Sequence, residues 1–217
     1  MMMSGTQRFF LRMYLFTRLN LLVSIAVWLY ERIFYQKELP FPLNIYWVSP
    51  HSIEFVLFGP SVNENLRLFG RSHAKLEGKL VNVKEDEKYK SLYQHFELGI
   101  DWINTDIFRG RYLERNKNKL PLRGGASSLN ELASQYKKYD DLYFDIFNTG
   151  YNAPGFFESL SQSSDSALSV FVLDNGKLAI GADGNHRLII ACLTDQDRIP
   201  IRIQAWEGRS YLLGIDG

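Results

Sequence analysis

Hydrophobic and polar positions follow two different periods along the chain, and together they predict a protein that mixes helices with strands. Apolar residues spaced three and four apart in the segments 89–102 and 129–149 are typical of helices that bury one face. Short apolar runs bounded by glycine, proline, serine or aspartate are typical of strands, and they occur at 45–48, 168–173, 178–180 and 199–203. The predicted fold class is α+β, with a mixed sheet flanked by helices.

Local signals at two places sharpen these boundaries. Ser127 or Ser128 with Glu131 has the spacing of a capping box, which predicts that the second helix begins there, and Gly150 predicts its end. The runs 168–173 and 178–180 flank Asp174-Asn175-Gly176, a composition favoured in tight turns, so we expect a hairpin. A short helix is expected around residues 154–162.

The segment 8–37 is hydrophobic but also carries Arg8, Arg12 and Arg18. Its uncharged stretch, Leu19 to Tyr30, is shorter than the roughly 20 residues that span a bilayer. We therefore expect a long hydrophobic and basic N-terminal helix over residues 1–40, separate from a domain over 41–217. Three environments stay open for it: the protein's own core or a partner protein, a membrane surface, or a membrane span.

Charge and cysteine content narrow the function classes. A formal net charge of +1 gives no global attraction to nucleic acid. Cys192 is the single cysteine, so an intramolecular disulfide and a zinc site of several thiolates are excluded, and its helical context predicts a buried hydrophobe, not a nucleophile. The four histidines show no spacing typical of a metal site. The location that fits is the cytoplasm, peripheral to the membrane if residues 8–37 contact lipid.

The segment 104–127 is the most basic part of the chain and contains Gly110, Gly124 and Gly125. These features predict an exposed connection, inserted with the following helix into the 41–217 domain. Its cations suit a solvated face or contact with phosphate or another polyanion. They are Arg109, Arg111, Arg115, Lys117, Lys119 and Arg123.

The junction at 180–187 carries the chemistry that the sequence suggests most clearly. A strand-like run ends at Ile180, and an apolar helix begins near Asn185. The N-terminus of a helix leaves backbone N–H groups free and carries partial positive charge, so it favours anions. Gly184 permits close approach, Arg187 offers a fork of donors suited to phosphate, and His186 can donate a hydrogen bond or transfer a proton.

Each of these residues also has a purely structural interpretation. Gly184 can simply make the turn, Arg187 can bridge to a nearby carboxylate, and His186 can be a satisfied structural histidine. Asp183 suits three roles: a cap, a group that orients His186, or a ligand to a metal. The spacing alone leaves these alternatives open.

The segment 174–203 resembles the phosphate-binding segment of the ParB/sulfiredoxin superfamily. The matching residues are Gly184, His186 and Arg187, followed by the helix and the strand that contains Ile199-Pro200-Ile201. The resemblance covers roughly the last 80 residues, is faint over 45–130 and is absent before residue 45. It implies a ParB/sulfiredoxin-like mixed sheet flanked by helices, with a phosphate site at Gly184, Asn185, His186 and Arg187.

Departures from the family pattern remove several of its activities. The reactive cysteine of sulfiredoxins corresponds to Asn185, so that activity is not expected here. Fourteen residues follow Ile203, which leaves no room downstream for the helix-turn-helix and dimerisation segments of the partitioning proteins. The pair His186-Arg187 is similar to sulfiredoxins and to archaeal free-serine kinases of this fold, not to the two arginines of partitioning ParB proteins.

The predicted function is therefore binding of a nucleotide (ATP, ADP or CTP) or a phosphorylated small molecule, extending to phosphotransfer as in a small-molecule kinase. In that case Mg²⁺ is the expected cofactor with Asp183 as its ligand, His186 and Asp183 assist, and Glu158 is the candidate base. Two alternatives of other classes stay open. One is a non-catalytic module that senses nucleotide or contacts DNA, and the other is a membrane-peripheral accessory protein.

Overall fold

A computed structural model describes residues 25–26, 29, 44–59, 76–151, 167–181 and 184–207 of the chain. Ile25, Ala26 and Leu29 are helical. The rest of the N-terminal helix predicted for residues 1–40, and the short helix predicted at 154–162, lie outside the described residues. No helix in the described part of the chain is long and apolar enough to cross a membrane.

Six strands of the described chain form one mixed sheet in the order β1-β6-β4-β5-β2-β3. Neighbours pair antiparallel in β1–β6, β2–β3 and β4–β5, and parallel in β2–β5 and β4–β6. The strands are β1 (Tyr46–Val48), β2 (Ile53–Phe58), β3 (Lys79–Asn82), β4 (Leu168–Val172), β5 (Leu178–Ile180) and β6 (Ile199–Trp206). The predicted mixed sheet and the hairpin β4–β5 are thus confirmed.

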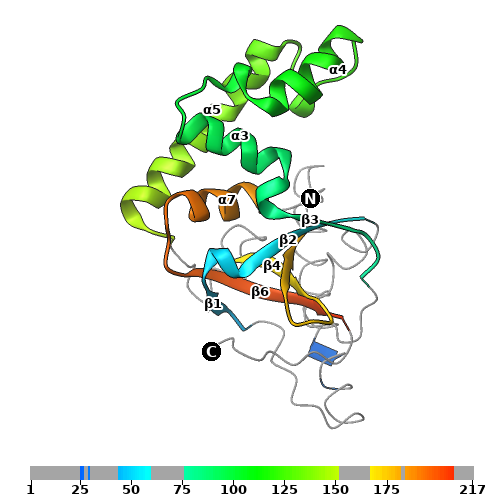
Figure 1. Cartoon of the computed structure of the whole chain (residues 1–217), viewed down its shortest axis with the longest axis vertical. Coiled ribbons are helices and arrows are strands. Elements are labelled where there is room, and N and C mark those ends of the chain that lie inside the picture. Colours follow the sequence, from blue (N-terminus) through cyan, green and yellow to red (C-terminus); the bar gives the residue numbers. More distant parts are fainter. Residues whose placement is uncertain are drawn as a thin grey trace, which may run out of the picture.

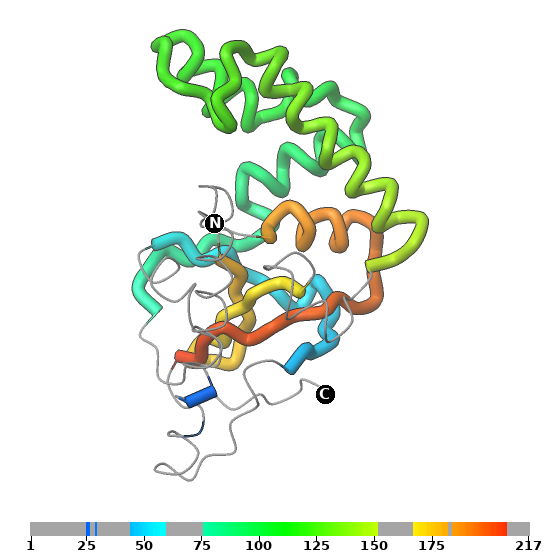
Figure 2. Tube along the Cα trace, turned by 180° about the vertical axis from the view of Figure 1, so that it is seen from behind, coloured from blue at the N-terminus to red at the C-terminus, as the bar shows by residue number. Residues whose placement is uncertain are grey.

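Helices α3, α4, α5 and α7 lie on one side of the sheet (Figure 1). Helix α7 (Asn185–Leu193) packs directly on it, and α3 (Glu87–Phe96) and α5 (Leu129–Thr149) contact α7 from above. Between α3 and α5 the chain forms a π-helical turn η4 (Phe108–Tyr112) and α4 (Leu113–Lys117). Figure 2 shows this helical arm, residues 87–149, extending away from the sheet. Short 3-10 turns are η1 (Pro50–Ser52), η2 (Val83–Glu85), η3 (Trp102–Asn104) and η5 (Arg123–Gly125).

The main core lies between the sheet and the helices. Because side chains of a strand alternate between two faces, Val170, Ile180 and Ile201 point toward α7, and Leu188 and Ile189 meet them from the helix. A smaller cluster on the opposite face contains Leu57, Phe171, Leu173, Ala179 and Ala205. Burial of both faces explains why β4 and β5 are nearly continuous apolar runs.

Helix α5 begins and ends where its capping signals predict. The Ser128 Oγ accepts a hydrogen bond from the backbone N–H of Glu131 at 3.2 Å. Glu131 Oε2 accepts from the backbone N–H of Ser127 at 2.8 Å, so both candidate serines take part in the cap. Gly150 follows the last turn with a φ of +75°.

The prediction of an exposed connection over 104–127 is wrong for its first half. Residues 106–117 are helical, and Ile107, Phe108 and Tyr112 are buried. The cations of this segment are exposed, as predicted. Burial of three large apolar side chains offsets the cost of Gly110 in the helix and of the dense charge around it.

Candidate anion site

The N-terminus of α7 has the local geometry that the sequence predicts for the 180–187 junction. Strand β5 ends at Ile180, Gly184 is the N-cap, and the helix begins at Asn185. The N-cap supplies no side-chain hydrogen bond, and the first intrahelical bond runs from the N–H of Leu188 to the carbonyl of Gly184 at 3.0 Å. In any helix the N–H groups of the first turn have no acceptor within the helix itself, which makes this end of α7 electropositive.

Gly184 is required by this turn for two physical reasons. Its φ of +88° lies in the left-handed region, which side chains disfavour. A Cβ at this position would also stand 2.8 Å from Cδ2 of Leu168 in β4. Glycine therefore lets the helix start close to the sheet.

The guanidinium of Arg187 lies back over the same turn. Its Nη2 lies 3.9 Å from the point where a Cβ on Gly184 would stand, so the side chain is directed toward the N-terminus of its own helix. Burial raises the pKa of the neighbouring Tyr151, and the positive charge of Arg187 opposes that rise. The guanidinium therefore lies at the electropositive N-terminus of α7.

Asn185 is the least accessible residue of the turn. Its side chain is fully buried, at 0% exposure, and neither Nδ2 nor Oδ1 has a hydrogen-bond partner in the described structure. An unpaired buried amide costs on the order of 1–3 kcal/mol, so such groups in proteins are normally completed by a ligand or an ordered water. Independently of Arg187, the unpaired amide of Asn185 therefore favours a polar ligand or a water molecule at this turn.

His186 packs against two tyrosines of α5. Its ring stacks on Tyr139 with 4.1 Å between centroids and an interplanar angle of 13°, and it meets Tyr136 edge-on at 6.4 Å. Its Nε2 is buried and has no hydrogen-bond partner in the described structure. The imidazole is therefore held in a fixed orientation at the junction of α5 and α7.

The imidazole of His186 is neutral at pH 7. Burial lowers its pKa to about 3, and the positive charges of Lys88, Arg123 and Lys138 act in the same direction. A base that transfers protons near neutral pH needs a pKa near that pH. Of the two roles predicted for His186, the structure therefore supports hydrogen bonding and not proton transfer.

The structure brings four of the six predicted site residues together, namely Gly184, Asn185, His186 and Arg187. Asp183 and Glu158 lie outside the described residues. Within the described ranges no cluster of three or more His, Cys, Asp or Glu side chains is placed to hold a metal. Asp183 as a magnesium ligand therefore stays a prediction.

Sequence reasoning missed three basic residues of the helical arm whose positive charges lower the pKa of His186. Lys88 comes from α3, Arg123 from η5 and Lys138 from α5. The sequence places Arg123 in a basic run and carries no signal that relates this cation to α7.

Cys192 lies on the buried side of α7, as predicted. Burial raises the pKa of its thiol to about 11, which keeps the sulfur protonated at physiological pH. This residue takes no part in the site.

Comparison of the chain with protein-family models, with curated proteins and with solved structures finds no match in any of the three.

Proposed function

We propose that the protein binds a phosphorylated ligand, a nucleotide in the first place, at the N-terminus of α7. The observation that carries the proposal is the position of the Arg187 guanidinium over the glycine turn at the N-terminus of α7. A planar fork of donors next to a helix N-terminus suits the oxygens of a phosphate group. The unpaired amide of Asn185 supports the same interpretation.

The ParB/sulfiredoxin resemblance belongs to this proposal. Its support is the order of β5, the turn at Gly184, α7 and β6, combined with a mixed sheet that has helices on one side. The proposal is binding and not phosphoryl transfer, since Asp183 and Glu158, the carboxylates expected for transfer, lie outside the described residues. If Mg²⁺ accompanies the ligand, it neutralises phosphate oxygens, and Asp183 is the expected protein ligand.

The alternative of a DNA-binding module receives less support. It depends on the basic run 109–123 forming one continuous strip. Arg111 instead pairs with Glu87 at 2.8 Å, and Nε of Arg115 donates to the carbonyl of Pro121 at 3.0 Å. Arg123 acts on the tyrosines of α5 and on His186. The run is thus divided among different neighbours.

A thermal-shift measurement on the full chain tests the proposed function. Inorganic phosphate, ADP, ATP and CTP are added with and without Mg²⁺, and at least one is expected to raise the melting temperature. A ligand at a hundred times its dissociation constant stabilises the folded state by about 2.7 kcal/mol. Arg187→Gln is expected to abolish the shift, and Arg187→Lys, which keeps the charge but not the fork, to retain part of it.

Arg198→Gln is the matched control, because Arg198 is an exposed arginine beyond the other end of α7. It should respond to ligand as the wild type does. The melting temperature of each variant without ligand shows whether the fold is intact. Stabilisation of Arg187→Gln equal to that of the wild type, or no stabilisation of the wild type by any of these ligands, contradicts the proposal.

A further inference from the structure

The aromatic side chains of α5 change their environment halfway along the helix. In the first half Tyr136 and Tyr139 are buried. In the second half Phe144 and Phe147 are 59% and 61% exposed, and neither belongs to the buried side that the helix turns toward the core. Single exposed apolar side chains are ordinary in proteins, whereas contiguous ones mark a contact surface.

Ring contacts join these two phenylalanines into one cluster. The Tyr143 ring meets Phe144 edge-on with 5.7 Å between centroids, and it lies parallel to Phe147 at 6.2 Å. Tyr143 also stacks on Phe96 of α3, with 4.1 Å between centroids. These four residues form the aromatic face, which extends from the second half of α5 to the end of α3.

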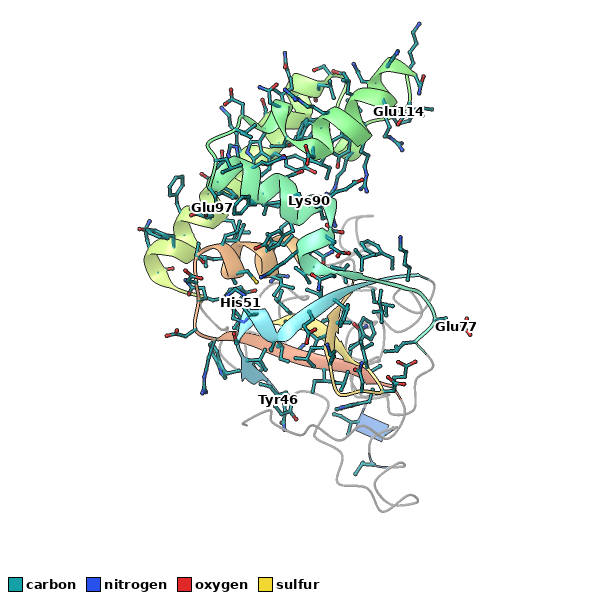
Figure 3. The ribbon with its side chains drawn as sticks, in the orientation of Figure 1. Tyr46, His51, Glu77, Lys90, Glu97 and Glu114 are labelled. Atoms are coloured by element: carbon teal, nitrogen blue, oxygen red, sulfur yellow. The ribbon has the colours of Figure 1, made fainter. Side chains whose placement is uncertain are left out.

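Carboxylates flank the aromatic face. On α5, Asp141 lies one helical turn before Phe144 and Asp145 directly follows it, and both aspartates are exposed. Glu97, the C-cap of α3, lies beside the Tyr143 hydroxyl (Figure 3). The ion pairs in the described part of the chain use other carboxylates. The rim of the face is therefore negative.

Helix ends at this place add to the negative potential. A helix carries partial negative charge at its C-terminus, where cations are stabilised. Helix α3 ends at the face itself, and the last turn of α5 contains no basic residue. The C-terminal end of α7 adjoins that of α5, since Nε2 of Gln196 donates to the carbonyl of Ile146 at 3.4 Å. Positive charge on a partner is consequently favoured here.

We infer that the aromatic face binds a basic amphipathic helix of another polypeptide. The phenylalanines pack against the apolar side of that helix, and the three carboxylates pair with its lysines or arginines. Charge complementarity selects this occupant. The same carboxylates repel nucleic acid and the anionic surface of a membrane. The inference is independent of the proposed anion site, which lies at the opposite end of α7.

The test is a fluorescence titration in which the full chain is added to a labelled amphipathic model helix built from leucine and lysine. The comparison peptide carries glutamate at every lysine position. The wild type is expected to bind the lysine helix at least about tenfold more tightly than the glutamate helix. Added salt is expected to weaken the lysine complex, because exposed ion pairs are screened.

Variants of the face separate its apolar and charged contributions. Phe144→Ser combined with Phe147→Ser should lower affinity for the lysine helix about tenfold or more, and the exposure of both positions keeps the core intact. Asp141→Lys should lower it about threefold, the size expected for an exposed ion pair. The matched controls are Leu113→Ser and Glu114→Lys, both exposed and on the outer arm (Figure 3), and neither should change the affinity.

Equal binding of the two peptides overturns the inference, and so does an equal loss in the control variants, because unspecific contact would then explain the binding. No binding of the lysine helix up to about 100 µM overturns it as well. Sedimentation of the wild type alone and binding to phosphatidylcholine vesicles are measured in parallel. Self-association or vesicle binding that the two serine substitutions abolish assigns the face to a second copy or to lipid, and either result overturns the inference.

Discussion

At the scale of single residues, His186 shows how position changes chemistry. A histidine beside an arginine in a phosphate-binding turn suggests an acid–base group when only the sequence is known. In the structure the ring is stacked on Tyr139, largely buried, and near three cations and the positive end of a helix. All of these disfavour the charged imidazole, so the ring is neutral at physiological pH.

Burial of His186 predicts that the folded protein loses stability in acid because of this one residue. The pKa of His186 is about 3 in the folded protein and near 6.5 when unfolded, so between these values the unfolded state binds more protons. The contribution of neutral His186 to the free energy of unfolding is complete above pH 6.5, and it declines as the pH falls toward 3. A shift of one pKa unit corresponds to about 1.4 kcal/mol of unfolding free energy. Reduced for the partial exposure of the ring, the expected loss of unfolding free energy at pH 4.5 is about 2 kcal/mol.

His186→Phe keeps a ring on Tyr139 and removes the titrating group. The difference in free energy of unfolding between pH 7 and pH 4.5, measured by urea denaturation, should therefore be smaller in this variant than in the wild type. His51→Gln is the control, because His51 is half-exposed and lies 3.9 Å from Asp195 at the other end of α7 (Figure 3). An equal acid-induced loss in all three proteins would show that His186 is not the sensor.

Some features were predictable because they are local. Gly184 of the site has the positive φ and the close approach that a strand-to-helix turn demands. Away from the site, Ser128 with Glu131 forms the predicted cap of α5. The effect of Arg123 and Lys138 on the pKa of His186 was not predictable in the same way, because it depends on the packing of the arm and no spacing along the chain encodes it.

At the scale of elements, a buried polar contact ties α3 to α5 within the helical arm. Asp140 Oδ1 accepts hydrogen bonds from Trp102 Nε1 at 2.9 Å and from His95 Nε2 at 3.1 Å. His95 Nδ1 lies 2.7 Å from the carbonyl oxygen of Ile100, and its ring stacks on Trp102 at 4.0 Å. One carboxylate thus links the end of α3, the turn η3 and the middle of α5.

Asp140→Ala removes the acceptor for two partly buried donors and is expected to lower the free energy of unfolding by about 2 kcal/mol. Asp141→Ala, an exposed neighbour on the same helix, should change it by less than about 0.5 kcal/mol. Urea unfolding monitored by tryptophan fluorescence provides both values. Equal stability of the two variants would mean that the hydrogen bonds of Asp140 contribute nothing to the free energy of unfolding. Apolar packing alone would then hold α5 on α3.

The element that sequence periodicity missed has a physical explanation. Residues 108–112 form a π-helical turn, which inserts an extra residue and moves the buried positions off the 3.6-residue period. Phe108 and Tyr112 are therefore buried while Leu113, which follows them, is 48% exposed. Helix α5 and the hairpin β4–β5 keep regular periods, and the pattern found both of them.

At the scale of the whole molecule, α7 lies between the sheet and the helical arm. The sheet supports α7 and its N-terminal turn, and the positive charges of Lys88, Arg123 and Lys138 in the arm lower the pKa of His186. Figure 3 places Glu114 on α4, at the end of the arm far from the sheet, so the outer arm and the site are separate regions. With a net charge of only +1, attraction of an anion depends on this local arrangement and not on a field of the whole protein.

The measurement that tests this account most directly is a ¹H–¹⁵N NMR titration of the full chain with inorganic pyrophosphate. The account predicts saturable shifts of the backbone amides of Asn185, His186 and Arg187 at the start of α7. Shifts confined to the basic residues 109–119, or amides of α7 that stay unchanged up to millimolar pyrophosphate, would contradict it.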